Sequence, residues 1–594
     1  MWACSLRRGD ILGEAAQGVF VNDARHLSRL ALKVDDERPT FLGCSDVSGH
    51  EAMIRLAHRR EIGITRHRSI DAVLTERFEF RNYGAARTVI VELEVACDFA
   101  DIFGIRGWGL AGAGSPESRI LAQELRYERR GRDGITRATG VTFDPQPSSL
   151  VPAPAGTIVR WELGLDPGEL ARIEVRVACT PLDETGFSPR PPLITGSSQT
   201  RLGRSLAAAS RDLEMLRTPL DGRTILAAGV PWYVALFGRD SLLAALALIE
   251  VAPDIAGDTL LTLATHQATE DAPARDAEPG KILHELRRGE LASAGLLPFS
   301  PYFGTADATP LFIQLSAEYL LVTGDRATFD ALEPSLLRAL RWIDEHGDTD
   351  GDGFVEYLRR AEHGLVNQGW KDSPDAIVHA DGTPASGPIA LCEVQGYVYA
   401  AKSRLADAWE VTDRATEALA LRAQASELRQ AFSDAFWIEE RDCLALALDG
   451  AKRQVASVTS NAGHCLWSGI VPDDLASRLA GRLMAADMFS GWGLRTLSSD
   501  SPAFNPMSYH RGSVWPHDGA LAAAGLARYG FRDEAARIAD ALLDVADASR
   551  ANRLPELLCG FDRTPGEPYV PYPQTCAPQA WAAAAVFLLA RLHT

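Results

Sequence analysis

The chain has 594 residues, of which 46% are hydrophobic and 23% charged, and its formal net charge is −19. This length exceeds what one compact core usually supports, so we expect more than one domain. A surface this acidic repels nucleic acids and anionic membranes, which excludes polyanions as favourable partners but leaves neutral ligands such as sugars open.

The first third of the chain predicts β-strands. Apolar and polar residues alternate along 89–97, 159–163 and 173–179. A period of two with one polar face indicates half-buried antiparallel strands. Many short strands without helices between them are typical of a sandwich, and we assign 1–185 to an N-terminal antiparallel β-sandwich domain.

The periodicity changes after a Pro-, Gly- and Ser-rich stretch at 186–198. Apolar residues then recur at spacings of four and three from Leu202 to Leu216, which is one face of a helix. We assign 186–220 to a linker with its helix and 221–594 to a helical domain. Thr309 and Pro310 predict the N-cap and first residue of a helix. Further helical runs lie at 390–410, 414–436, 472–486, 516–529, 533–547 and 578–592.

The expected fold class is therefore α+β multidomain. Helices in such numbers pack as hairpins, and a closed ring of six hairpins, an (α/α)6 barrel, is one way to arrange them. The loops between them are rich in aromatic and charged residues, whereas solvated connections are normally small and polar, so we interpret them as walls of a ligand site. These loops are Trp232–Ser241, Gly369–Asp375, Phe489–Trp492, Asn505–Asp518 and Leu554–Phe561.

Carboxylates in these loops are the candidates for chemistry. Each has a structural alternative. Asp240 precedes a helical run and fits an N-cap, Asp372 precedes a proline and fits an Asx turn, and Glu556 fits a buried ion pair with Arg553 or another arginine.

Two acids in aromatic loops point to sugar chemistry. Hydrolysis of an acetal needs one carboxylic acid to protonate the leaving oxygen and one carboxylate to activate water or attack the sugar. Apolar or aromatic surroundings keep the acid protonated near neutral pH. Glu285 and Glu290 are further candidates for the second carboxylate.

Neither a cofactor nor a catalytic metal is expected, because the 13 histidines show no ligand spacing typical of a metal site. The segment Asp348–Gly353 resembles an EF-hand loop, but its twelfth position is Arg359 instead of Glu. A tight Asx/Gly turn is the favoured interpretation, and a calcium site of another kind stays open.

The nine cysteines include no C-x-x-C pair and fit reduced thiols. Residues Met1–Arg8 lack the apolar stretch of a signal peptide, and the longest apolar run, 580–590, is too short to cross a bilayer. We therefore expect a cytoplasmic protein that binds neither nucleic acid nor membrane.

Longer motifs carry a resemblance to a known family. The chain resembles, over essentially its whole length, the bacterial amylo-α-1,6-glucosidase-like proteins, also called glycogen-debranching-enzyme-like. This resemblance implies a β-sandwich followed by an (α/α)6 barrel, as in trehalases, glucoamylases and processing α-glucosidases. The motifs are FVNDARHLSRL (20–30), AAGVPWYVALFGRDS (227–241), GKILHELRRGE (280–290), FGTADATPLF (303–312), GWKDSPD (369–375), PIALCEVQGYVY (388–399), PMSYHRGSVWPHD (506–518) and RLPELLCGF (553–561).

The resemblance also implies roles for individual residues. It places the general acid at Asp372 and the general base at Glu556. It assigns Arg239 and Asp240 to a motif that binds the hydroxyls of the cleaved sugar. Further residues that would line the sugar subsite are Trp370, Trp515 and His517.

The implied activity is an inverting, exo-acting α-glucosidase on α-linked glucose, with the α-1,6 linkage of debranching left open. Its partner is an oligosaccharide or a small glucoside. Three alternatives stay open. They are a hydrolase of sucrose, trehalose or a glucosyl-glycerol compound, a phosphorolytic or isomerising enzyme on the same barrel, and a non-catalytic glycan-binding protein.

Overall fold

The computed structural model describes residues 1–109, 114–121, 124–181, 193, 199–549 and 551–592. It divides into two compact units. The first, here called the sandwich unit, comprises Met1–Pro189 and Arg287–Ser300. The second, the helical unit, comprises Arg190–Leu286 and Pro301–Thr594. Most of the predicted linker at 186–198 lies outside the described residues.

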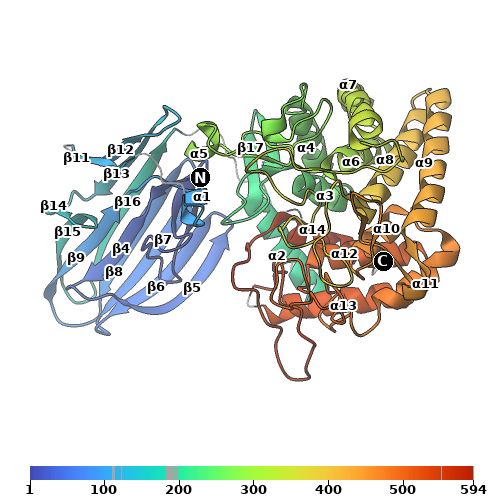
Figure 1. The fold of residues 1–594 in the computed structure, drawn as a ribbon. Coiled ribbons are helices and arrows are strands. Elements are labelled where there is room, and N and C mark those ends of the chain that lie inside the picture. Colours follow the sequence, from blue (N-terminus) through green and yellow to red (C-terminus); the bar gives the residue numbers. More distant parts are fainter. Residues whose placement is uncertain (110–113, 122–123, 182–192, 194–198, 550, 593–594) are drawn as a thin grey trace. The chain divides into compact units, whose positions relative to one another are not determined.

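Antiparallel sheets make up the described part of the sandwich unit (Figure 1). The strands are β1 (Trp2–Cys4), β2 (Gly18–Val21), β3 (Ala24–Leu27), β4 (Arg29–Val34), β5 (Thr40–Ser48), β6 (Glu51–His58), β7 (Ile62–Ile70), β8 (Val73–Asn82), β9 (Arg87–Ala96), β10 (Ala100–Asp101), β11 (Glu117–Ile120), β12 (Glu124–Arg130), β13 (Thr136–Asp144), β14 (Ser149–Ala153), β15 (Gly156–Leu165) and β16 (Leu170–Thr180). An eight-stranded sheet has the order β11-β12-β13-β16-β8-β7-β6-β5, and two four-stranded sheets have the orders β14-β15-β9-β4 and β1-β2-β3-β10.

One apolar core lies between the eight-stranded sheet and the sheet that contains β9. In β16, Ile173, Val175 and Val177 are fully buried in this core, while the residues between them face away. The Tyr127 hydroxyl of β12 donates to the Val95 carbonyl of β9 at 2.9 Å, which ties the two sheets together. The strands predicted from the period of two are confirmed, because that period reports which side chains reach the core.

Residues 287–300, which we placed with the helical domain, belong instead to the sandwich unit. This segment carries the short helix α5 (Glu290–Ser293). The Arg287 guanidinium pairs with Asp23 at 2.9 Å, and the Leu291 amide donates to Asp101 at 3.0 Å. Asp101 is also the N-cap of the other short helix of this unit, α1 (Ile102–Ile105).

The helical unit is built from long helices and very short strands. Its helices are α2 (Arg201–Leu216), α3 (Gly238–Leu248), α4 (Pro253–Thr265), α6 (Ala308–Thr323), α7 (Arg326–Trp342), α8 (Cys392–Glu410), α9 (Ala415–Phe436), α10 (Asn461–Ser468), α11 (Asp473–Leu483), α12 (Pro516–Arg528), α13 (Arg532–Ala548) and α14 (Ala580–Arg591). Its strands are β17 (Arg217–Leu220), β18 (Arg223–Leu226), β19 (Leu236–Phe237), β20 (Glu285–Leu286), β21 (Ala390–Leu391), β22 (Trp437–Ile438), β23 (Cys443–Leu444), β24 (Ala447–Leu448) and β25 (Gln454–Val455). No helix in the described ranges is both long and apolar enough to cross a membrane.

Six of these helices pack in a cyclic order. The helices α3, α6, α8, α10, α12 and α14 each contact the next, and α14 contacts α3 (Figure 1). We call them the ring helices. Each also packs against a second helix, which is α4, α7, α9, α11, α13 and α2 in the same order. All 11 residues of α3 are buried, whereas α9 buries one face, as expected for an inner and an outer helix.

The helix predicted to begin at Thr309 and Pro310 begins earlier. Asp307 is the N-cap of α6, and Pro310 lies in the first turn. A proline is tolerated there because the first amides of a helix have no partner within the helix. The Thr309 hydroxyl accepts from the Ile282 amide at 3.0 Å instead of capping the helix.

Candidate active site

The first turns of the ring helices meet at one mouth of the ring. The Gln579 side chain, at the N-cap of α14, donates to Asp240 in the first turn of α3 at 3.4 Å. Arg239 of α3 donates to Asp307, the N-cap of α6, at 2.9 Å. A helix N-terminus carries a partial positive charge, so this mouth favours carboxylates.

Arg239 binds two of the acidic groups at this mouth. Its guanidinium is 2% exposed and donates to Asp307 Oδ2 at 2.9 Å and to Asp372 Oδ2 at 3.1 Å. Burial raises the pKa of the neighbouring Asp240 to about 7 against the lowering effect of Arg239, and the charges of Asp372, Glu556 and Asp307 add to the rise. Four carboxyl groups therefore lie within electrostatic reach of one another.

Asp372 combines a perturbed acidity with access to a ligand. Burial raises the pKa of this carboxyl, and the charge of Asp307 raises it further while Arg239 lowers it. The side chain nevertheless keeps 28% exposure. A carboxyl group that is enclosed by protein yet reachable from the mouth has the properties needed for proton donation.

Glu556 is held by two donors. Its Oε1 accepts from the Tyr509 hydroxyl and its Oε2 from the Cys576 amide, both at 2.6 Å, and the side chain is 2% exposed. Arg553 is the wrong partner for the ion-pair alternative, because its guanidinium forms a fork with Asp212.

Tyr509 donates to one predicted catalytic carboxyl and lies within electrostatic reach of the other. Burial is the main reason that the pKa of its hydroxyl lies well above the ordinary value. The charge of Glu556 raises this pKa further, and the charge of Asp372 adds a smaller rise. The hydroxyl therefore stays protonated and able to donate to Glu556.

The three predicted subsite residues form one aromatic cluster. The Trp370 ring meets Trp515 at 5.8 Å and His517 at 5.0 Å, edge to face in both cases, and His517 stacks on Trp581 at 3.8 Å. Their exposures are 1%, 1% and 3%. They support the site from within the core, and their contact with a sugar stays a prediction.

Family models match both parts of the chain. Residues 1–176 match the N-terminal domain of some glycogen debranching enzymes. Residues 233–562 match the mannosylglycerate hydrolase MGH1-like glycoside hydrolase domain, which spans more than half of the chain. The chain belongs to the MGH1-like glycoside hydrolases. The family resemblance predicted from the sequence is confirmed, and a carbohydrate is the substrate class. A comparison with curated proteins gives no match.

The two other glutamates proposed for this hydrolase lie in different places. Glu290 belongs to the sandwich unit, where it pairs with Arg129 and accepts from the Arg132 amide at 3.0 Å. Glu285 is buried in β20, opposite Phe237, the residue before α3. Glu285 therefore stays near the site as a competitor for the base, and Glu290 is part of an ion pair in the sandwich unit.

Sequence reasoning missed several residues of the hydrolase site. Tyr509 and Gln579 each donate to one of the candidate acids, and Asp307 binds Arg239. His510 bonds the Ser373 hydroxyl at 2.9 Å and so joins two of the aromatic loops. Asp307 and Tyr509 lie inside motifs that carried the family resemblance, so the signal was present without a role attached.

The EF-hand-like loop of the hydrolase is a turn closed by a lysine. Asp348 accepts from the Gly351 amide at 2.8 Å and from the Gly353 amide at 2.9 Å, as the Asx-turn interpretation predicts. The Lys452 ammonium lies 2.9 Å from Asp350 and 2.6 Å from Asp352. The same ammonium also pairs with Glu356, so one positive charge is shared by three carboxylates and offsets only part of their charge. The ligand oxygens of Asp348, Asp350 and Asp352 lie within 4.8 Å of one another, so a calcium site here stays open.

Proposed function

We propose that this glycoside hydrolase is an inverting α-glycosidase whose acid is Asp372 and whose base is Glu556. We also propose that the cyclic packing of its helices is an (α/α)6 barrel. The observation that carries the proposal is Asp372, which combines a raised pKa with 28% exposure. Glu556, which accepts from Tyr509 within electrostatic reach of Asp372, supplies the second carboxyl that acetal hydrolysis requires.

In this mechanism Asp372 protonates the glycosidic oxygen. Arg239 holds its Oδ2, which leaves Oδ1 to carry the proton toward the substrate. As the bond to the leaving group breaks, Glu556 takes a proton from a water that attacks the anomeric carbon from the opposite face, and the configuration inverts. Tyr509 and the Cys576 amide keep the Glu556 carboxylate oriented during this step.

We propose different roles for Arg239 and Asp240. Both outer nitrogens of Arg239 are engaged by Asp307 and Asp372, so we assign it a positioning role. Asp240 receives a long 3.4 Å bond from Gln579 and keeps acceptor capacity for the hydroxyls of the cleaved sugar.

The proposed substrate is neutral, with α-linked glucose at a non-reducing end. Four carboxyl groups surround one guanidinium, which disfavours an anionic substrate. The match to a debranching-enzyme N-terminal domain favours a glucan oligosaccharide. The name of the matched catalytic domain favours a second candidate, a small glycoside such as mannosylglycerate, whose carboxylate this charge pattern opposes.

A screen of glycosides with Asp372→Asn and Glu556→Gln tests the proposal. The wild type should release sugar from at least one neutral α-glucoside among maltose, isomaltose, trehalose, sucrose and glucosylglycerol. Each substitution should lower kcat by about 10²–10⁴, the usual worth of a positioned proton-transfer group, with little change in melting temperature. The matched control Glu285→Gln should stay active.

Two results would contradict the proposal. If Glu556→Gln stays active while Glu285→Gln is dead, the base is Glu285. If turnover requires inorganic phosphate, the enzyme is a phosphorylase instead of a hydrolase.

A further inference from the structure

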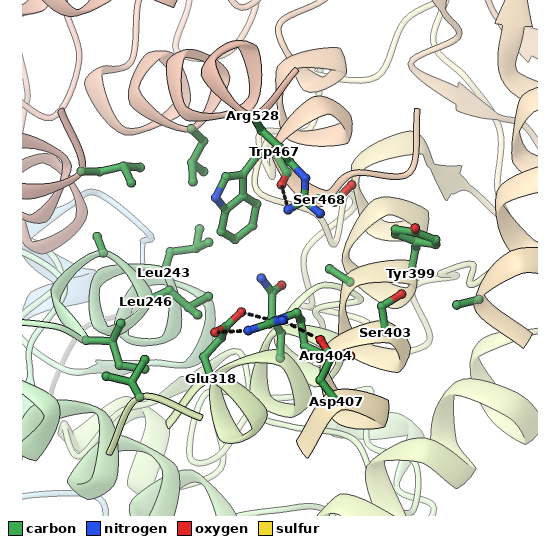
Figure 2. Close-up of a pocket in the computed structure, with 18 of the residues that line it drawn as sticks. Leu243, Leu246, Glu318, Tyr399, Ser403, Arg404, Asp407, Trp467, Ser468 and Arg528 are labelled. Atoms are coloured by element: carbon green, nitrogen blue, oxygen red, sulfur yellow. Dashed lines mark hydrogen bonds and ion pairs between the residues drawn. The ribbon is translucent and has the colours of Figure 1, made fainter. Parts of the chain in front are cut away.

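A cavity lies within the helical unit, at the mouth of the ring away from the candidate active site (Figure 2). Its volume is about 650 Å³. Every ring helix contributes to its lining beyond its first turn, whereas the candidate active site is built on the first turns. One lining residue from each ring helix, in chain order, is Leu246, Glu318, Arg404, Trp467, Arg528 and Arg591.

One wall of this cavity is a fixed ion-pair network. The Arg404 guanidinium donates to the two Glu318 oxygens at 2.6 Å and 3.0 Å, and to Asp407 at 2.6 Å. A forked pair of this kind holds both side chains in one geometry. The wall therefore presents polar atoms in set positions, and its charges largely cancel.

Four further arginines line the cavity. Arg422 pairs with Asp407 and Glu410, and Arg429 donates to the Ile470 and Val471 carbonyls. The other two face helix ends. Arg528 donates to the Trp467 carbonyl at 3.4 Å, and Arg591 donates to the Ala247 carbonyl at 2.9 Å. Carbonyls at the C-terminus of a helix carry a partial negative charge, which offsets these cations. A neutral polar ligand suits such a cavity better than an anion.

Two features point to a sugar as that ligand. Trp467 is only partly buried, and Figure 2 shows its indole ring projecting into the cavity, across from Glu318 and Arg404. Gln314, which also lines the cavity, is 6% exposed, and its Oε1 has no hydrogen-bond partner within the described part of the chain. An aromatic face beside an unsatisfied buried carbonyl fits a pyranose ring and one of its hydroxyls.

We propose that this cavity is a second, non-catalytic binding site for a neutral saccharide. The sugar stacks on Trp467, donates a hydroxyl proton to Gln314 and places other hydroxyls against the Glu318–Arg404 wall. The volume lies in the range of about 300–1,000 Å³ that small-molecule sites occupy. The proposal is independent of the roles given to Asp372 and Glu556.

Calorimetric titration of the full chain with maltose and with trehalose tests this site. The background substitution Asp372→Asn prevents turnover of the probe. Ser403→Trp adds an indole to the cavity lining, and Ser477→Trp is the matched control on an exposed position of α11. For at least one of the two sugars, the Ser403→Trp protein should bind one equivalent fewer than the Ser477→Trp protein.

Equal stoichiometry in these two proteins with both sugars would overturn the proposal. Gln314→Met gives a second, nearly isosteric test that does not depend on the tryptophan variant folding. This substitution should weaken the binding of the sugar in this cavity about tenfold. Unchanged affinities for both sugars would overturn the proposal as well. Failure of the proposed catalytic function is seen separately, as absent hydrolysis of every glycoside by the wild type and by Ser403→Trp alike.

Discussion

Asp307 offers a way to change the acidity of Asp372 without altering Asp372 itself. The two carboxylates share the Arg239 guanidinium, and the charge of Asp307 raises the pKa of Asp372. Asp307→Asn removes that charge and leaves Arg239 to act mainly on Asp372. Both effects lower the pKa of the acid, so activity should be lost at a lower pH as the solution becomes alkaline.

The size of the effect follows from the geometry. The two carboxylate oxygens bond adjacent guanidinium nitrogens at 2.9 Å and 3.1 Å. Two charges held in this way lie roughly 5–6 Å apart, which at an effective dielectric constant of about 20 is an interaction of about 3 kcal/mol. At about 1.36 kcal/mol per pKa unit this corresponds to about two units. Allowing for relaxation of the site, we expect the alkaline limb of kcat/KM to move down by about 1–2 pH units.

The assay is the pH dependence of kcat/KM on an oligosaccharide, followed by released glucose. Nitrophenyl glycosides are unsuitable because their leaving group departs without a proton. Asp325→Asn is the matched control, since Asp325 caps α7 and bonds Thr328 and Tyr319. A folded Asp307→Asn protein whose alkaline limb stays in place, or moves to higher pH, would refute the assignment of Asp372 as the acid.

Three further predictions concern stereochemistry, metal and stability. An α-glucoside should release β-glucose first by proton NMR, and early α-glucose would contradict inversion. Chelation should leave the initial rate unchanged, since acetal hydrolysis by two carboxylates needs no metal, and an immediate loss of turnover that added metal restores would contradict this. Burial raises the pKa of Asp240 from 3.8 to about 7, so the folded protein keeps a proton that the unfolded chain loses. Stability should therefore fall between about pH 4 and pH 7, by up to about 4 kcal/mol, and Asp240→Asn should flatten this slope in thermal melts; an unchanged slope would count against it.

Elements that bury one face were predictable from the sequence. The helix at 201–216 and strand β16 each repeat apolar residues with the period of their own geometry. Helix α10 was missed because its eight residues are too few, and too nearly all buried, to show a period. The segment 287–300 was misplaced because its partners, such as Asp23 and Asp101, lie about 190 or more residues away in the chain.

The site was predictable only where a residue stands out locally. Asp372 and Glu556 are acids in aromatic or apolar segments, and the structure places Arg239 and Asp240 beside them. Asp307 and Tyr509 lie in the family motifs, but an aspartate before a helix and a tyrosine in a loop are common, so their residue types alone indicated no role. The cavity around Trp467 was not predictable from the sequence either, because its lining comes from helices spread over some 350 residues.

The closure of the ring by α14 also orders events during synthesis. Arg239 and Asp372 can meet once the first half of the helical unit has been made. The Cys576 amide, which holds Glu556, and Gln579, which reaches Asp240 from 339 residues away, come from the segment that leads into α14. Such distant contacts form late, since the chain between them must first be complete. If Asp372 and Glu556 act as proposed, a nascent chain carries the acid well before it can fix the base, and hydrolysis has to wait until the segment that leads into α14 has been made.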